Sequence, residues 1–364
     1  MAASVLSGAL LIASIGALID APARAGDVGA ADGRGVQAAR NHSSATDIND
    51  RGWIVGSSTS PDGSLTQHPV LWRPQSRRIV DLGTFKGYDW GTASAINHRG
   101  DIVGSYFEAP YLDDAVAFLR RHGTRRMVDL GNLGGSSALA TDINVHRHIV
   151  GWSTTSTGER RPFLWRPHTH RMRNLGTLGN RTYSEAIAIN DDGTVLGRAW
   201  TPRAHGTVWH TWLWKPHHDH LIRLKRRGLP LTTYVSGINN RGQVVGCTSK
   251  DGDPNRAVLW RPLRRDTVSI RSLGGRSCAW GINDMSEVVG WSGTRTGDTR
   301  AFRWTPGMRR MKSIGTLRRP GPSVATAVNS RGFIVGSSGV SLRRHAFVWD
   351  PRARRMINLG TLVN

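Results

Sequence analysis

Seven segments of the chain repeat one pattern of small, polar and apolar positions. The last copy reads ATAVNSRGFIVGSSG, and in every copy an asparagine is followed seven residues later by a glycine. The asparagines are 44 to 49 residues apart, at Asn49, Asn97, Asn144, Asn190, Asn239, Asn283 and Asn329. The matching glycines are Gly56, Gly104, Gly151, Gly197, Gly246, Gly290 and Gly336. A fixed offset in seven copies indicates one structural unit used seven times.

Each unit contains four short strand signals. In the last unit they are Ala325–Asn329, Phe333–Ser338, His345–Trp349 and Arg355–Gly360. The first strand has small residues four and two positions before its asparagine, which favours a place at a crowded axis. Periods in the forties with four strands are typical of propeller blades. We therefore predict an all-β fold, a seven-bladed β-propeller of four-stranded repeats of about 47 residues, over residues 44–364.

Three details refine this prediction. The second strand carries an apolar pair such as Ile54-Val55, as expected of a strand buried on both faces. Tryptophan ends the third strand in six units, and we expect these rings to pack between blades. Arg147 and Ser286 replace the turn glycine of other units, so those turns should be strained or differently shaped.

The ring should close without a strand shared between its ends, unless residues 26–43 supply one.

The first residues resemble an export signal. An apolar stretch is followed by Ala23-Arg24-Ala25, so residues 1–25 are interpreted as a signal peptide and 26–43 as a flexible linker. No basic residue precedes the apolar stretch. A buried N-terminal helix is the alternative. The interpretation places the protein outside the cell, secreted or associated with the envelope, with no transmembrane span in the mature chain.

The phrases RHAFVWDP, INDRGWIVG and NLGTLG resemble the HAF repeat of bacterial proteins described as probable extracellular repeat proteins. The resemblance covers about residues 44–362. It implies export and a propeller-like fold, and it implies no activity and no site residues.

Arginine dominates the charge. The formal net charge is +23, and only five lysines occur. In a four-stranded blade the loops after the first and third strands leave the same side, so their arginines should form one basic face. The residues assigned to it are Arg51, Arg77, Arg78, Arg99, Arg125, Arg126, Arg264, Arg265, Arg309, Arg310, Arg331, Arg354 and Arg355.

This face favours, as the main interpretation, an exported non-catalytic scaffold, expected to be a monomer, that binds an anionic cell-wall polymer or polysaccharide. Export makes nucleic acid a poor candidate. Alternatively, the arginines bind no partner and only protect the strand edges and keep the rim of the ring hydrated.

A second hypothesis is catalytic, although the sequence favours a protein that is not an enzyme. Asp47 and Asp142 occupy small-residue positions of the inner strand and should line the channel, where paired carboxylates could act as acid and base. This alternative is a propeller lyase or hydrolase with its site at the channel mouth. The sequence contains no Gly-x-Ser-x-Gly elbow, His-Glu-x-x-His zinc motif, phosphate-binding loop or dinucleotide fingerprint. We predict no cofactor. We also predict no metal site, because histidines as close in sequence as those of His217–His220 chelate metals adventitiously, whereas a real site needs preorganised and supported ligands.

Cys247 and Cys278 are the two cysteines. They fall at the same end of adjacent blades, which makes a disulfide possible.

Overall fold

The structure is a computed structural model. It describes residues 41–362 except 63–65, 74–77, 109–113, 180, 182, 204–205, 219, 225–231, 251–252, 265, 319–320 and 341–342. The predicted signal peptide, nearly all of the predicted linker, Arg77 and Arg265 lie outside the described residues.

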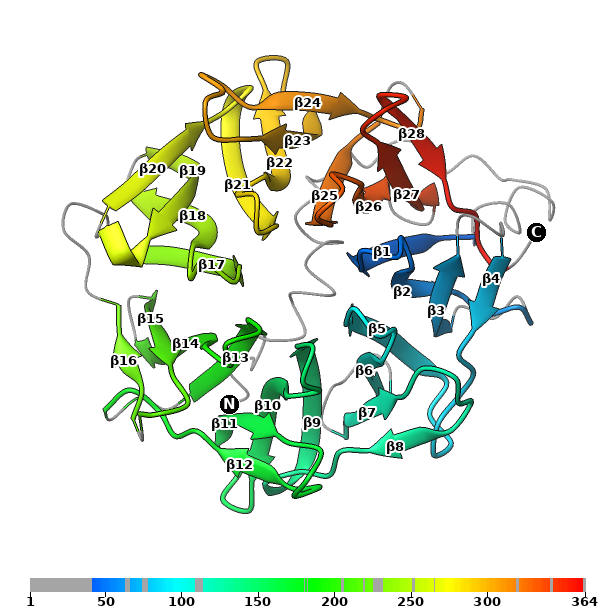
Figure 1. Ribbon diagram of the computed structural model, residues 1–364, viewed down its shortest axis with the longest axis vertical. Helices are drawn as coiled ribbons and strands as arrows, with labels where there is room; N and C mark the ends of the chain where they lie inside the picture. The colour runs from blue at the N-terminus through cyan, green and yellow to red at the C-terminus, as the bar shows by residue number, and fades with distance from the viewer. Residues whose placement is uncertain are drawn as a thin grey trace.

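Seven four-stranded antiparallel sheets stand around an axis as the blades of a β-propeller (Figure 1). Each sheet is made of four consecutive strands. The innermost strands are β1 (Ser43–Ile48), β5 (Trp90–Ile96), β9 (Gly134–Ile143), β13 (Tyr183–Ile189), β17 (Thr232–Ile238), β21 (Gly274–Ile282) and β25 (Ser323–Val328). The second strands are β2 (Ile54–Thr59), β6 (Ile102–Phe107), β10 (Ile149–Thr155), β14 (Val195–Arg203), β18 (Val244–Lys250), β22 (Val288–Thr294) and β26 (Ile334–Ser338).

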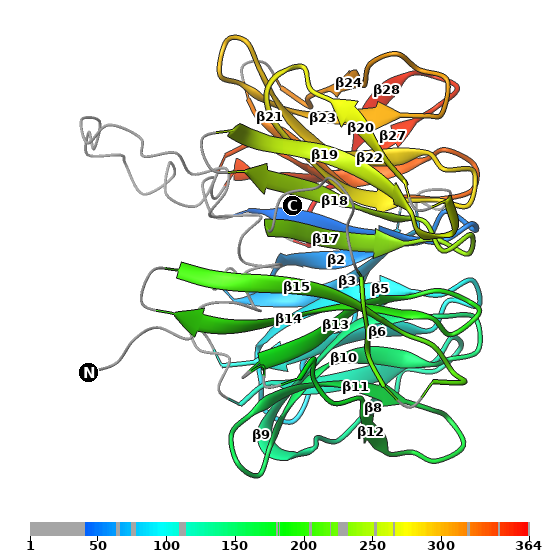
Figure 2. The same ribbon diagram turned by 90° about the vertical axis from the view of Figure 1, so that its left-hand side faces the viewer.

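The outer half of each blade completes the sheet. The third strands are β3 (Gln67–Arg73), β7 (Val116–Arg120), β11 (Arg160–Trp165), β15 (Gly206–Trp214), β19 (Asp253–Arg261), β23 (Thr299–Trp304) and β27 (His345–Asp350). The outermost strands are β4 (Arg78–Asp81), β8 (Met127–Asp129), β12 (Met172–Asn174), β16 (Ile222–Arg223), β20 (Asp266–Arg271), β24 (Lys312–Gly315) and β28 (Arg355–Asn358). A 3-10 turn, Pro262–Arg264, precedes β20. The strands run between the two faces of the ring (Figure 2). The predicted fold is confirmed, and no helix among the described residues is long and apolar enough to cross a lipid bilayer.

The apolar core lies between neighbouring blades. Ile54 and Val55 are both fully buried, as expected of a strand covered on both sides. Trp72 of the first blade packs in one cluster with Val335 and Val348 of the seventh. The tryptophans at this position therefore join blades to each other, as predicted.

A β-bulge in every inner strand explains the repeated glycine. In the first blade the register shifts between Ala45 and Asp47, and Gly56 lies opposite Ala45. A Cβ on Gly56 would stand 2.0 Å from the carbonyl oxygen of Ser44. At the other six repeat glycines a Cβ would lie 1.9 to 2.4 Å from the corresponding carbonyl oxygen. Only glycine fits, because the bulge pushes a carbonyl onto the second strand.

The repeat asparagines form a closed ring of hydrogen bonds. Each side-chain amide donates to the backbone carbonyl oxygen of the next asparagine, at 2.9 to 3.3 Å, including the step from Asn329 back to Asn49. The side-chain oxygen of Asn49 accepts the backbone N–H groups of Arg51 and Trp53, which shapes the turn. Each repeat asparagine thus stabilises its own turn and also the contact with the next blade.

The two turns without glycine keep the shape of the others. Arg147 and Ser286 adopt φ of 60° and 63°, in the region that glycine occupies in the other five turns. Their backbone N–H groups donate to Asn144 and Asn283, as Gly52 does to Asn49. A different turn shape, one of the two expectations, is thus wrong, and the positive φ leaves backbone strain at these two positions.

The ring closes by contacts between complete blades. The backbone N–H of Ser43 donates to the Arg344 carbonyl oxygen at 2.9 Å, and the Thr326 hydroxyl donates to the Ala45 carbonyl oxygen at 2.9 Å. Among the described residues, no strand of one terminus enters the sheet of the other.

Candidate functional site

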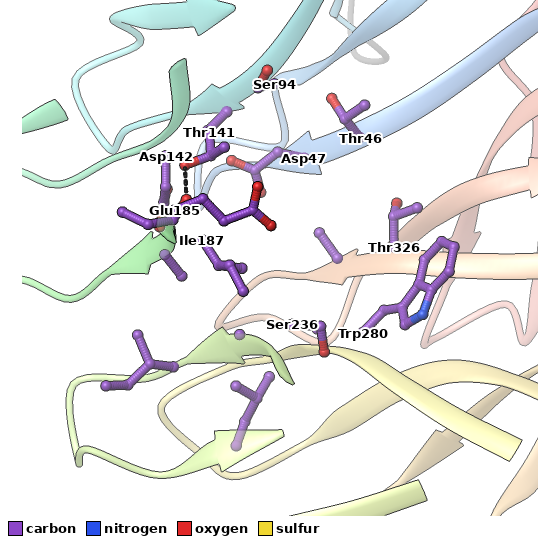
Figure 3. A pocket seen from close by; sticks show the side chains of 18 of the residues that line it. Thr46, Asp47, Ser94, Thr141, Asp142, Glu185, Ile187, Ser236, Trp280 and Thr326 are labelled. Atoms are coloured by element: carbon purple, nitrogen blue, oxygen red, sulfur yellow. Dashed lines mark hydrogen bonds between the residues drawn. The ribbon is translucent and has the colours of Figure 1, made fainter. Parts of the chain in front are cut away.

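A cavity of about 280 Å³ occupies the centre of the ring. Inner strands from all seven blades contribute to its wall (Figure 3). Most of the wall comes from the residues three and two positions before the repeat asparagines. The residues three before are Thr46, Ser94, Thr141, Ile187, Ser236, Trp280 and Thr326. The residues two before are Asp47, Ala95, Asp142, Ala188, Gly237, Gly281 and Ala327.

The bulge explains why adjacent residues both line the cavity. A regular strand alternates its side chains, whereas the extra residue of a bulge turns two neighbours toward one side. The Thr46 hydroxyl donates to the carbonyl oxygens of Val55, at 3.0 Å, and Ala93, at 2.7 Å, so it links two blades. Thr141, Ser236 and Thr326 make the same pair of bonds. The sixth blade has Trp280 at this position, a large aromatic side chain that cannot make this pair of bonds.

Asp47 and Asp142 lie inside the cavity, as the sequence predicted. The Asp142 carboxylate accepts the backbone N–H groups of Ile143 and Ile189, each at 2.8 Å. Asp47 accepts those of Ile48 and Ile96, at 2.8 and 2.9 Å. Each aspartate thus bridges two blades and still presents its carboxylate to the cavity.

The surroundings of both aspartates favour the protonated carboxyl. Burial raises the pKa of Asp142 to about 7, with smaller upward contributions from the charges of Asp47 and Asp191, against the two backbone hydrogen bonds. Burial likewise raises the pKa of Asp47, and the charge of Asp50 adds to it. Asp142 can therefore hold a proton near neutral pH.

A buried charge cluster occupies the far end of the cavity. Glu185 accepts a hydrogen bond from Arg160 at 2.5 Å and one from Arg198, and all three side chains are less than a tenth exposed. The Arg160 guanidinium lies 3.6 Å from the Trp152 ring centroid, and that of Arg198 lies 4.8 Å from Tyr234. Burial lowers the pKa of Arg160 to about 10, which keeps it charged at neutral pH. Glu185 and Arg198 line the cavity, so the wall contains both signs of charge.

The predicted basic face is spread around the ring and forms no single pocket. Its described arginines are all exposed, on the turns after the first and third strands or at the starts of β4 and β28. They are Arg51, Arg78, Arg99, Arg125, Arg126, Arg264, Arg309, Arg310, Arg331, Arg354 and Arg355. None of them lines the central cavity.

Cys247 and Cys278 are joined by a disulfide, with their Cα atoms 4.7 Å apart. The bond connects β18 of the fifth blade to β21 of the sixth.

Three parts of the site were not predicted from the sequence. They are Trp280 with the other residues three before the asparagines, the Glu185–Arg198 pair, and Arg160. A signal was available for the first set: hydroxyl residues recur at this position in five units, and one unit has a tryptophan.

No family model matches the chain, and no curated protein sequence matches it. The resemblance to HAF repeat proteins therefore stays a prediction.

Solved propellers match the fold. The β-propeller domain of the Trilobed protease from Pyrococcus furiosus, described as having an open velcro topology, is 11% identical with a TM-score of 0.62, over 88% of this chain and 97% of that one. A prolyl endopeptidase is 10% identical with a TM-score of 0.62, over 90% and 52%. A puromycin-hydrolyzing peptidase from Mycobacterium tuberculosis is 12% identical with a TM-score of 0.55, over 90% and 55%. The chain spans about half the length of these last two proteins.

These comparisons correct the functional expectation. The main interpretation, a non-catalytic scaffold for anionic polymers, is contradicted and the hydrolase alternative is favoured, because the three propellers named above belong to peptidases. The basic surface misled because net charge reports general attraction and not the chemistry of a site. At this level of identity the likeness itself shows the fold, and the chain is a seven-bladed β-propeller.

Proposed function

We propose that the protein is a hydrolase-type propeller whose reaction takes place in the central cavity. The observation that carries this proposal is the pair of carboxylates in the cavity wall, one of which has a pKa of about 7. A carboxyl group with such a pKa is matched to proton transfer at neutral pH. The similarity to propellers of peptidases supports the reaction class and leaves the scissile bond open.

The two carboxylates take complementary roles. Asp142 donates its proton to the leaving group of the substrate as the scissile bond breaks. Asp47, in its ionised form, accepts a proton from the water whose oxygen forms the new bond. The proton returns from Asp47 to Asp142 through solvent after product leaves, so the pair ends as it began. The backbone N–H groups that hold both carboxylates fix their orientation, which a proton donor and acceptor both need.

Export remains part of the proposal. The disulfide between Cys247 and Cys278 supports it, because such bonds persist mainly in oxidising compartments.

The test is turnover by the full chain. Purified protein is offered nitrophenyl esters, peptide nitroanilides and aryl glycosides, and we expect one of these classes to be hydrolysed. Asp142→Asn and Asp47→Asn should each lower kcat by about 100-fold or more. Asp298→Asn is the matched control, since Asp298 is an exposed carboxylate in the turn after β22, and it should leave kcat unchanged.

Circular dichroism and the melting temperature establish that each variant is folded. Hydrolysis of none of the three classes, or hydrolysis that both cavity variants leave intact, would contradict the proposal.

A further inference from the structure

Carboxyl groups outnumber basic groups in the wall of the central cavity. The lining includes Asp47, Asp142 and Glu185, against one guanidinium, that of Arg198. The protein as a whole has a formal charge of +23. A cation beside Asp47 and Asp142 favours their ionised form, and a low-dielectric cavity concentrates the field of these charges, so the cavity attracts cations although the outer surface is basic.

Three fixed aspartates lie on the side of the asparagine ring, in or beside turns that also carry exposed arginines such as Arg51 and Arg331. The aspartates follow the repeat asparagine in three blades: Asp50, Asp191 and Asp284. The side-chain amide of Asn240 donates to Asp191 at 2.8 Å and to Asp284 at 2.9 Å, and Asp50 accepts the backbone N–H of Ser330 at 2.8 Å. These carboxylates offset part of the positive charge of the arginines on the path of a cation toward the cavity.

Trp280 gives the cavity an aromatic wall. It is the one large aromatic residue among the seven bulge positions, and it stands across the cavity from Asp47 and Asp142 (Figure 3). The electron-rich face of an indole attracts a positively charged nitrogen. An aromatic side chain opposite two carboxylates fits a ligand that has both a cationic nitrogen and an apolar part.

The other end of the cavity fixes the direction in which such a ligand lies. Arg160 and Arg198 both bind the carboxylate of Glu185, so this carboxylate is already engaged by two guanidinium groups. Glu185 lies three positions further from its repeat asparagine than Asp142 does, so this end is roughly 10 Å away along the strand direction. A cationic nitrogen therefore finds its carboxylate partners at Asp47 and Asp142 and not at this end.

We infer that the cavity selects an organic cation, with its ammonium nitrogen between Asp47 and Asp142 and its apolar part against Trp280. The inference rests on the proposed function, because the ammonium is then the amine leaving group after it has accepted the proton of Asp142. It also accounts for a tryptophan at a position where four blades have a hydroxyl that links neighbouring strands.

The experiment measures binding without turnover. Benzylamine, which is an ammonium at pH 8, is titrated into the full chain by calorimetry, with benzyl alcohol as the neutral probe and benzoate as the anionic probe. We expect benzylammonium to bind at least tenfold more tightly than either. Asp142→Asn and Trp280→Leu should each weaken its binding by about tenfold. Trp280→Phe should restore most of it, because an aromatic face is again present, and Asp298→Asn should change nothing.

Equal binding of the three probes, or unchanged binding in both Asp142→Asn and Trp280→Leu, would overturn the inference. Hydrolysis of a neutral substrate that benzylamine does not inhibit would also overturn it while leaving the proposed function intact. Selective binding of benzylammonium by a protein that hydrolyses none of the offered classes would uphold the inference and remove the proposed function.

Discussion

The side-chain amide of Asn329 donates a 3.1 Å hydrogen bond to the backbone carbonyl oxygen of Asn49, 280 residues earlier in the chain. The bond is the seventh of an identical series, and it joins the last blade to the first. The series gives a physical reason for an asparagine in every unit. Its amide reaches the next blade while its carbonyl holds its own turn, and aspartate or leucine would lose one or both functions.

Removal of one member of the series should destabilise the whole ring. Asn144→Ala removes the buried bond to Asn190 and the two part-buried bonds accepted from the backbone N–H groups of His146 and His148. We expect a loss of about 2–4 kcal/mol in the free energy of unfolding. Asn174→Ala, which removes one exposed bond to Gly176, should cost less than about 1 kcal/mol. Urea unfolding measures the free energy of unfolding of both variants. Equal losses of this free energy would contradict a stabilising role of the asparagine ring.

The bulge glycine should tolerate no side chain. In Gly151→Ala the new Cβ would lie 1.9 Å from the Leu139 carbonyl oxygen, so the two inner strands of the third blade must separate. We expect a loss of at least about 3 kcal/mol or failure to fold. Gly158→Ala is the control, because Gly158 has a φ of 76° and open space around it, and it should cost about 1 kcal/mol. Thermal melts that rank the two variants in the opposite order would contradict this account.

The stability of the protein should fall as the pH rises through the range in which Asp142 loses its proton. The unfolded chain releases this proton near pH 4, whereas the folded protein keeps it until about pH 7. Between these values the folded state binds more protons, so its free energy of unfolding decreases with pH, by at most about 4 kcal/mol from this group. Unfolding at a series of pH values should show a smaller decrease for Asp142→Asn than for the unmodified protein. Parallel curves would mean that Asp142 ionises normally.

The buried charge cluster should depend on its one carboxylate. Glu185→Gln removes the negative charge that binds the buried guanidinium groups of both Arg160 and Arg198. The expected cost is about 3–5 kcal/mol in the free energy of unfolding. Glu159→Gln offers a control in the same region, because Glu159 pairs with Arg161 at 2.7 Å but is about half exposed, and its loss should cost less than about 1 kcal/mol. Denaturant unfolding measures both, and a small effect at Glu185 would show that solvent reaches the cluster.

The sequence predicted the blades well because their signals are local. The strand boundaries of the last unit agree with β25 to β28 within about two residues, since turns, apolar pairs and the terminal tryptophan all occur within one unit. The position of Asp47 and Asp142 in the channel was predictable as well, because small residues mark the strand nearest the axis.

The rest of the site depends on pairing between strands. Simple alternation places the residue three before each asparagine on the face away from Asp47, and the bulge that brings Thr46 and Trp280 to the cavity appears only in the register of two strands. Glu185, Arg160 and Arg198 come from β13, β11 and β14, in two blades, so no local spacing brings them together.

Each sheet is one continuous stretch of chain. The fold therefore depends on the order of the units around the axis more than on the unit at which the chain starts. The described ends are adjacent, as the 2.8 Å hydrogen bond from the Ser43 hydroxyl to the Gly360 carbonyl oxygen shows. A circular permutant with these ends joined and a new opening between any two units would keep every strand pairing. The same organisation would allow gene duplication or deletion to add or remove a whole unit and so change the circumference of the ring without interrupting a sheet.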